Sequence, residues 1–128
     1  MIIVLIHWKI HLHDEARRSF FSHWKDTLTV SERSHLVGEF LSKPLSIDQT
    51  SFPCSLFNVP SHAQYESYFN VGLWQDVGAF KSQVIDPFVS ASQKPESFEF
   101  EYRERMLLSP ISWRSGEFAL PLTDHFST

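Results

Sequence analysis

The sequence predicts one α+β domain of the ferredoxin-like type, in which a four-stranded antiparallel sheet carries two helices on one face. The prediction rests on a length of 128 residues, which suits one core, and on hydrophobic patterns in the order strand, helix, strand, strand, helix, strand. We place the domain at residues 1–109, with a long loop at 44–64. Residues 110–128 are expected to form an extended tail docked on the domain or on a partner subunit.

The first strand and the first helix follow from two different periodicities. Residues 2–12 alternate between an apolar even face and a mixed odd face, as the side chains of a strand do. Asp14 predicts a helix N-cap, because its carboxylate can accept a hydrogen bond from a backbone N–H of the first turn. The helix is expected over residues 15–28, with an apolar stripe formed by Phe20, Phe21, Trp24 and Leu28.

The rest of the chain continues the pattern with three strands and a helix. The expected strands are residues 35–43, 65–74 and 97–109. Gly38 marks a candidate bulge in the first of them. Three prolines make the 44–64 segment a long connection, in which a short strand at 54–59 is an alternative. Asp76 is expected to cap the second helix, whose apolar positions in register are Val77, Phe80, Val84 and Phe88.

Composition narrows the class of protein. A formal net charge of −4 and the lack of a basic run argue against nucleic-acid binding. The single cysteine, Cys54, excludes an internal disulfide and fits a reducing compartment. The apolar run at residues 2–6 is too short for a signal peptide or a membrane span. We therefore expect a soluble, cytoplasmic protein with no membrane partner.

Aromatic side chains are abundant, with 12 Phe, 4 Trp and 3 Tyr. Such a content fits a core packed with rings, an aromatic-lined cavity or a large subunit interface. The first strand is apolar on its even face and half apolar on its odd face, whereas the helices cover only one face of the sheet. The economical cover for the other face is the same face of a second copy. We therefore expect a homodimer in which two sheets pack together.

The element order, together with two local stretches, resembles the dimeric α+β barrel superfamily and most closely its antibiotic-biosynthesis-monooxygenase-like branch. The first stretch is "NVGLWQDVGAFKSQV", where Trp74, Asp76 and Phe80 form the junction from strand to helix. The second is the closing strand "FEFEYRERML". The likeness covers residues 2–108 in order and spacing. It implies a dimer with one pocket per subunit, between the sheet and the helices.

The resemblance implies more than one activity. The superfamily includes cofactor-independent oxygenases of polycyclic aromatic substrates, haem-degrading enzymes and proteins with no assigned activity. The haem-degrading branch uses an asparagine on strand one, a tryptophan in the second helix and a histidine beyond it. This chain has His7 at the first position, reaches the second near Val84 and has no later histidine before His125. This departure argues against haem degradation.

His7 is the candidate catalytic residue. It lies in the middle of a strand expected to be central, where a partly buried imidazole can have a shifted pKa and act as a general base. We expect His7 to face the pocket, with a satisfied core or interface histidine as the alternative. The side chains expected to bind substrate there are Asn70, Trp74, Tyr68 and Arg103, with Tyr102 as the alternative to Arg103. Asn70, Arg103 or Tyr68 could also stabilise an oxyanion.

His11 and His13 are a weaker candidate pair for metal binding. Two residues apart on a strand, they point the same way with Cα atoms about 7 Å apart and could share a metal ion. A third ligand would have to come from His7, His35, His62 or Glu39. Because two ligands do not make a site, we expect no metal and interpret the pair as histidines at a strand end.

The sequence thus predicts a monooxygenase-like oxidoreductase that acts on a small aromatic or polyketide-type molecule without a bound cofactor. In such a reaction a base removes a phenolic or enolic proton, and the resulting carbanion reduces O₂ by one electron. The alternative, from another class, is a non-catalytic small-molecule-binding or stress-related dimer. The residues alone leave open whether the protein is an enzyme.

Overall fold

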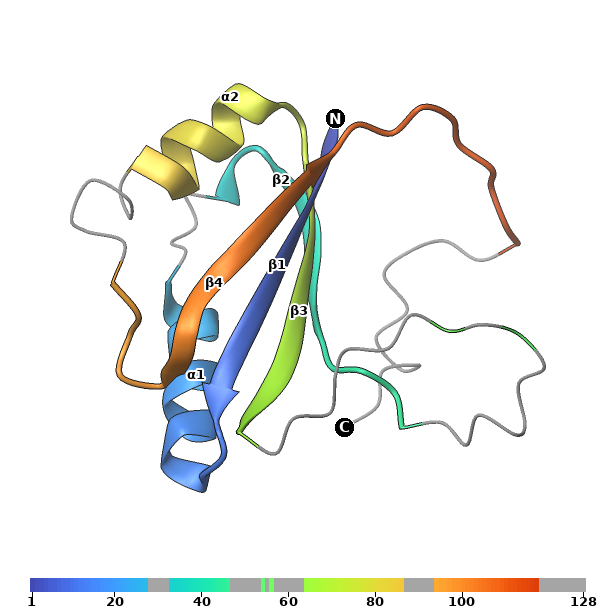
Figure 1. Ribbon diagram of the computed structural model, residues 1–128. Coiled ribbons are helices and arrows are strands. Elements are labelled where there is room, and N and C mark those ends of the chain that lie inside the picture. Colours follow the sequence, from blue (N-terminus) through green and yellow to red (C-terminus); the bar gives the residue numbers. More distant parts are fainter. Residues whose placement is uncertain (28–32, 47–53, 55, 57–63, 87–93, 118–128) are drawn as a thin grey trace.

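Four strands form one antiparallel sheet in the computed structural model, which describes residues 1–27, 33–46, 54, 56, 64–86 and 94–117. The central strands are β1 (Ile2–His11) and β3 (Tyr65–Trp74), and the edge strands are β2 (Leu36–Ser42) and β4 (Glu99–Leu108). Two helical segments lie on the same face of this sheet (Figure 1). They are α1 (Asp14–Asp26) and α2 (Val77–Phe80), which continues into a π-helical turn, η3 (Lys81–Ile85). The predicted ferredoxin-like βαββαβ fold is confirmed.

The sheet order β2-β3-β1-β4 follows from the two βαβ crossovers. Because β3 pairs antiparallel with both β1 and β2, it lies between the two strands of the first crossover. Along β1 and β3, Ile6 lies opposite Asn70 and His7 lies opposite Phe69. This register decides which side chains share a face of the sheet, since successive residues of a strand point to opposite sides.

The strand boundaries agree with the predicted ones to within two residues, and β3 has the predicted span. The bulge predicted at Gly38 is present as a register shift between Leu36 and Gly38. The alternative strand at 54–59 lies outside the described residues, except for Cys54 and Leu56, which belong to neither a helix nor a strand.

The N-terminus of α1 differs from the prediction by one residue. His13, with an extended backbone, is the N-cap, and its Nδ1 accepts a hydrogen bond from the backbone N–H of Ala16 at 3.1 Å. Asp14 is instead the first helical residue, where its carboxylate pairs with Arg17. An unprotonated imidazole nitrogen can fill the acceptor role that we assigned to the aspartate. The N-cap predicted at Asp76 is confirmed, because its Oδ1 accepts from the Ala79 N–H at 2.7 Å.

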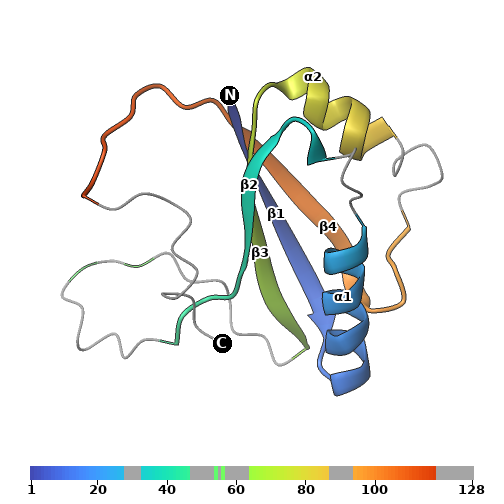
Figure 2. The same ribbon diagram turned by 180° about the vertical axis from the view of Figure 1, so that it is seen from behind.

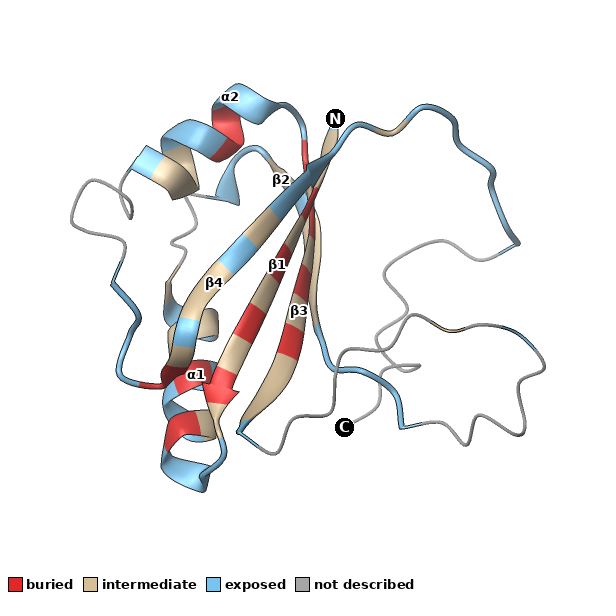
Figure 3. Ribbon diagram, in the orientation of Figure 1, coloured by how far each residue is buried: buried red, intermediate tan, exposed pale blue. Residues whose placement is uncertain are grey.

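The core lies between the sheet and the helices. The even face of β1 is buried from Val4 to Ile10, and Phe20 of α1 is fully buried against it, with its ring 5.0 Å from that of Trp8. Figure 3 shows buried residues along β1 and β3 and on the inner sides of α1 and α2. Phe21, expected in the same stripe, is 38% exposed. Two other predicted apolar positions, Leu28 and Phe88, lie outside the described residues.

The opposite face of the sheet is not covered by any described helix. It carries the odd residues of β1 and of β3, which are only partly buried, among them Leu5, His7, Phe69 and Val71. Residues 109–117 leave β4 in the direction away from the helices in both views (Figures 1 and 2). Docking of the tail after residue 110 therefore stays a prediction. Within the described ranges no helix is long and apolar enough to span a bilayer.

Candidate functional site

A pocket opens between the sheet and the helices. The pocket has a cavity volume of about 60 Å³, and all the empty space between its walls, open solvent included, measures about 590 Å³. Aromatic and aliphatic side chains make most of the wall, and four titratable side chains reach it. The lining residues are Val4, Ile6 and Trp8 of β1, His23 and Trp24 of α1, Thr27, Glu39 of β2, Asn70 and Trp74 of β3, Phe80 of α2, Val84 of η3, and Arg103 and Arg105 of β4.

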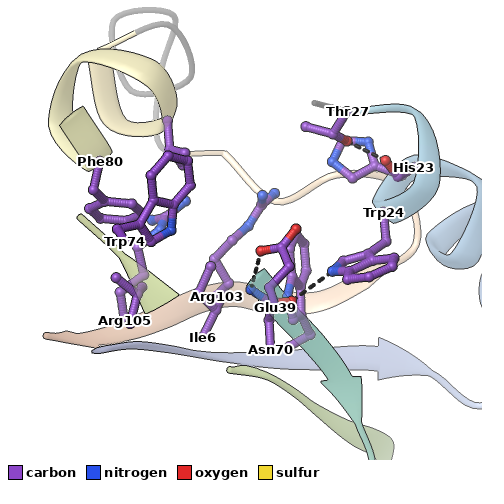
Figure 4. A pocket seen from close by; sticks show the side chains of 13 residues that line it. Ile6, His23, Trp24, Thr27, Glu39, Asn70, Trp74, Phe80, Arg103 and Arg105 are labelled. Carbon is purple, nitrogen blue, oxygen red and sulfur yellow. Dashed lines mark hydrogen bonds between the residues drawn. The ribbon is translucent and has the colours of Figure 1, made fainter. Parts of the chain in front are cut away.

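The wall is arranged in order from one helix to the other (Figure 4). Trp24 lies on the α1 side, and Trp74 and Phe80 lie on the α2 side. Glu39 and Arg103 lie between them. A flat molecule entering this pocket would therefore meet rings at both ends and charged groups in the middle.

A chain of two hydrogen bonds crosses the pocket. Trp24 Nε1 donates to Asn70 Oδ1 at 2.8 Å, and Asn70 Nδ2 donates to Glu39 Oε2 at 3.1 Å. Because the indole can only donate and the carboxylate accepts, the two partners fix which end of the Asn70 amide is oxygen. Asn70 is 4% exposed, so its amide is a buried polar group with both ends satisfied.

Glu39 is the acidic group of the pocket. Burial raises the pKa of its carboxyl above 4.5, although the Asn70 hydrogen bond acts in the opposite direction. Its Oε1 accepts no hydrogen bond from the described residues, and it forms no ion pair with them. Gly72 lies opposite Glu39 on β3, and a Cβ there would lie 3.3 Å from Trp74 Nε1, a tight contact, and 3.6 Å from Glu39 Oε2, an ordinary one.

The two arginines of the pocket differ in their partners. Arg103 Nη2 donates to Glu99 Oε1 at 2.6 Å, and its guanidinium lies 4.0 Å from the ring of Trp8. Glu99 is buried, so this pair is a buried salt bridge whose charges offset each other. Arg105 reaches only the Tyr102 hydroxyl, at 3.5 Å, and its Nε is buried without a hydrogen-bond partner. Among the described residues, Arg105 has no carboxylate partner.

His23 is the basic group of the wall that comes from α1. Its ring packs 5.2 Å from that of Phe98 and 6.1 Å, edge-on, from that of Trp8. Burial lowers the pKa of the imidazole, and the neighbouring Arg103 guanidinium lowers it further. Both effects favour the neutral imidazole.

Three of the four predicted substrate-binding residues lie together in this pocket, namely Asn70, Trp74 and Arg103. The fourth, Tyr68, shares their side of the sheet but does not line the pocket. Its hydroxyl donates to Glu66 at 2.7 Å, and burial raises its pKa to about 12. Tyr68 is thus a protonated donor in the core at neutral pH.

The expected meeting of His7 with Asn70 and Trp74 does not occur. His7 lies on the opposite face of the sheet, where its ring stacks on Phe69 at 4.5 Å and its Nε2 shares a hydrogen bond with Ser67 at 2.8 Å. The reason is the register, because Asn70 lies opposite Ile6 and therefore shares the even face of β1. Burial and the nearby Lys9 lower the pKa of His7.

The His11 and His13 rings stack with their centroids 5.9 Å apart. His13 Nδ1 is already occupied as the acceptor at the start of α1. In the part of the chain that the structure describes, no three side chains of His, Cys, Asp or Glu come together in a way that could hold a metal ion. His62, one of the possible third ligands, lies outside that part.

Of the titratable lining residues, Glu39 and His23 were not predicted to lie in the pocket. Glu39 had been considered only as a metal ligand. The sequence could have indicated its position, because Glu39 lies two residues before Leu41 in the same strand and therefore shares the face of the strand that packs against the core. His23 lies three residues after Phe20, on the same side of a helix.

Comparisons with known proteins agree with the fold. No family model matches the chain, and no curated protein matches it. A solved structure of a mutant of MhuD with two manganese protoporphyrin IX molecules bound per active site matches with a TM-score of 0.51 and 15% identity, over 89% of this chain and 99% of that chain. A mutant of SnoaB, a cofactor-independent oxygenase from Streptomyces nogalater, matches with a TM-score of 0.43 and 13% identity, over 94% of this chain and 97% of that chain.

The likeness confirms the predicted resemblance at the level of fold. The chain has a ferredoxin-like α+β fold, similar to that of the MhuD structure. The site on this fold is an aromatic-lined pocket between the sheet and the helices, with one carboxyl group that has no ion-pair partner among the described residues.

Proposed function

We propose that the protein is a monooxygenase-like enzyme that oxidises a small aromatic or polyketide-type molecule in this pocket without a bound cofactor. The observation that carries the proposal is the Trp24–Asn70–Glu39 chain of hydrogen bonds, which holds a buried carboxyl group in an aromatic-lined pocket. Such a pocket can bind a flat ring, exclude water and present a proton acceptor to it. The likeness to the MhuD structure supports only the fold on which this pocket is built.

The proposed chemistry needs only the substrate and O₂. A base removes a proton from an acidic C–H group, and the carbanion passes one electron to O₂. The two radicals combine into a hydroperoxide, which loses water to leave a carbonyl group. One oxygen atom thus enters the substrate and the other leaves as water, while the CH₂ group supplies both hydrogens and the electrons. The protein contributes orientation and desolvation.

A porphyrin does not fit the described pocket. Ligand sites usually enclose about 300–1,000 Å³, whereas this pocket measures about 60 Å³. The proposed substrate is therefore a smaller flat molecule, part of which lies in the open mouth.

The test is oxygen uptake by the purified protein with a panel of anthrones and hydroxynaphthalenes. We expect uptake with at least one of them and a product that has gained one oxygen atom and lost two hydrogens by mass spectrometry. Labelled O₂ should place its isotope in the product. Binding without any uptake across the panel would refute the oxygenase proposal.

A second candidate function is supported by the small enclosed volume. A pocket of about 60 Å³ is nearly filled by its own side chains, as expected of a non-catalytic binding or stress-related protein. In that case aromatic ligands should bind and be recovered unchanged, with no consumption of O₂.

The same proposal includes a homodimer built through the uncovered face of the sheet. This face carries partly buried apolar side chains such as Leu5, Phe69 and Val71. Beyond it, Ile111 and Trp113 are 99% and 82% exposed, which is unusual for large apolar side chains in water. A second copy packed on this face would bury the apolar side chains of the sheet and those of Ile111 and Trp113, and so remove the unfavourable free energy of their exposure to water.

A further inference from the structure

We propose that Glu39 is the proton acceptor of the pocket and that Arg105 holds the anion that its action creates. The ligand class that fits this pair is a flat carbonyl compound with an acidic C–H next to the carbonyl. This inference rests on the proposed function, because it names the groups that would perform its first step.

The position of Glu39 is that of an oriented base. Asn70 holds Oε2 at 3.1 Å and is itself held by Trp24 at 2.8 Å, so the carboxyl cannot rotate freely. Oε1 is left without a partner among the described residues and is the atom available to a ligand. A base held in place by a second group, which is held by a third, is a characteristic arrangement of catalytic sites.

Burial makes this carboxyl a stronger base than an ordinary glutamate. Water is partly excluded from it, which raises the pKa of its side chain. A proton acceptor works best when its pKa approaches the working pH. Among the described residues no arginine or lysine forms an ion pair with Glu39. The Asn70 hydrogen bond and the charge of Arg33 lower the pKa of Glu39, but burial outweighs both of them.

Of the two arginines of the pocket, Arg105 is the one without a carboxylate partner among the described residues. Arg103 is neutralised by Glu99 at 2.6 Å, whereas Arg105 contacts the Tyr102 side chain, whose hydroxyl lies at 3.5 Å and whose ring centroid lies 5.8 Å from the guanidinium. Its Nε is buried and makes no hydrogen bond to the described residues. A buried donor without a partner costs about 1–3 kcal/mol, and an oxyanion in the pocket would supply the missing acceptor.

The other titratable groups fit the role less well. His23 lines the same pocket, but its ring packs against Phe98 and Trp8 and forms no side-chain hydrogen bond to the described residues that would orient it. His7 lies on the opposite face of the sheet. Glu39 therefore combines access to the pocket with a fixed orientation.

The proposed step balances without any further reagent. The ligand C–H bond breaks and its electron pair stays on the ligand, which becomes an enolate. The proton forms a new O–H bond at Glu39 Oε1. The negative charge moves from the carboxylate to the enolate oxygen, where the Arg105 guanidinium faces it. In the absence of O₂ the step simply reverses.

Reversal allows the step to be tested without turnover. The experiment incubates the full chain with β-tetralone in D₂O without oxygen, and mass spectrometry follows deuterium entering the ligand. The unmodified protein should accelerate exchange over buffer. Glu39→Gln should lower the rate by about 10²-fold or more, which is the usual contribution of a general base. Arg105→Gln should also lower it, because the enolate loses its partner.

Matched variants separate a catalytic effect from a structural one. Glu66→Gln is the same substitution on β3 at a carboxylate that binds Arg17 outside the pocket, and it should leave exchange unchanged. Glu39→Asp keeps the acid but withdraws it by one methylene, so exchange should fall without a loss of folding. Quenching of tryptophan fluorescence by β-tetralone reports binding in each variant.

The outcomes distinguish this inference from the function on which it rests. Binding with an exchange rate that Glu39→Gln does not change would overturn the role of Glu39 alone. So would loss of exchange in His23→Gln while Glu39→Gln keeps it, or binding with no exchange above that of buffer. No binding of β-tetralone by the unmodified protein, with no oxygen uptake across the anthrone panel, would refute the proposed function as well.

Discussion

Trp24 Nε1 and Asn70 Oδ1 lie 2.8 Å apart and tie helix α1 to the centre of the sheet. Asn70→Asp keeps this acceptor but removes the Nδ2 donor from Glu39, and it places a second acid beside a buried one. We expect the free energy of unfolding to fall by about 1–3 kcal/mol. Urea denaturation measures it. Ser67→Ala on the opposite face of β3 is the control and should lower the free energy of unfolding by about 0.5–1.5 kcal/mol. An equal decrease in both variants would contradict a special role for the Trp24–Asn70–Glu39 hydrogen bonds.

Glu39 should make stability fall as the pH rises. Its folded pKa lies above its usual 4.5, so the folded state holds the proton more tightly than the unfolded state does. The stabilisation is present below pH 4.5 and is lost as the pH rises through the folded pKa. Glu39→Gln should therefore melt at a higher temperature than the unmodified protein at pH 7 and lose that advantage at pH 4. Thermal melting across this range checks the sign of the pH dependence. A difference in melting temperature between the two proteins that stays constant with pH would show that burial does not control the pKa of Glu39.

His23 should have the opposite dependence. Its folded pKa is lowered from 6.5, so the unfolded state binds the proton better in acid. The stabilisation is present above pH 6.5 and is lost as the pH falls through the folded pKa. His23→Gln should flatten the decline in melting temperature below pH 6.5. His7, whose pKa is lowered as well, gives a parallel variant on the other face. A decline that neither variant flattens would have to come from other groups.

The aromatic core should be sensitive to truncation at Phe20. This ring is fully buried and contacts those of Trp8, Tyr68 and Phe98 at 5.0–5.7 Å. Phe20→Ala should lower the free energy of unfolding by about 3–5 kcal/mol. Phe21→Ala is a neighbouring control of the same chemistry, 38% exposed, and should cost clearly less. Chemical denaturation compares the two.

The homodimer proposal predicts the effect of a charge on the uncovered face. Val71→Asp points away from the helices, so it should leave the fold intact but disrupt packing against a second copy. Light scattering after gel filtration should show a dimer for the unmodified protein and a monomer for the variant. A monomeric unmodified protein would rule the dimer out.

Local patterns predicted the elements well, whereas long-range pairing decided the site. The alternation of β1 and the cap at Asp76 depend on neighbouring residues, and both were predicted correctly. The face on which His7 lies relative to Asn70 depends on the register of two strands separated by about sixty residues, which no local pattern contains. The order of elements brought Asn70 and Trp74 to one pocket, but only the register placed Glu39 there with them.

Gly72 gives this site a signature that can be read in other sequences. A methyl group at position 72 would lie 3.3 Å from the indole nitrogen of Trp74, which is tighter than an ordinary contact, so the identities of positions 72 and 74 depend on each other. Natural variants with a larger residue at position 72 should have given up the tryptophan at position 74, and those that keep the tryptophan should keep the glycine. Inheritance of the two as a pair would mark the chains that share this wall of the pocket.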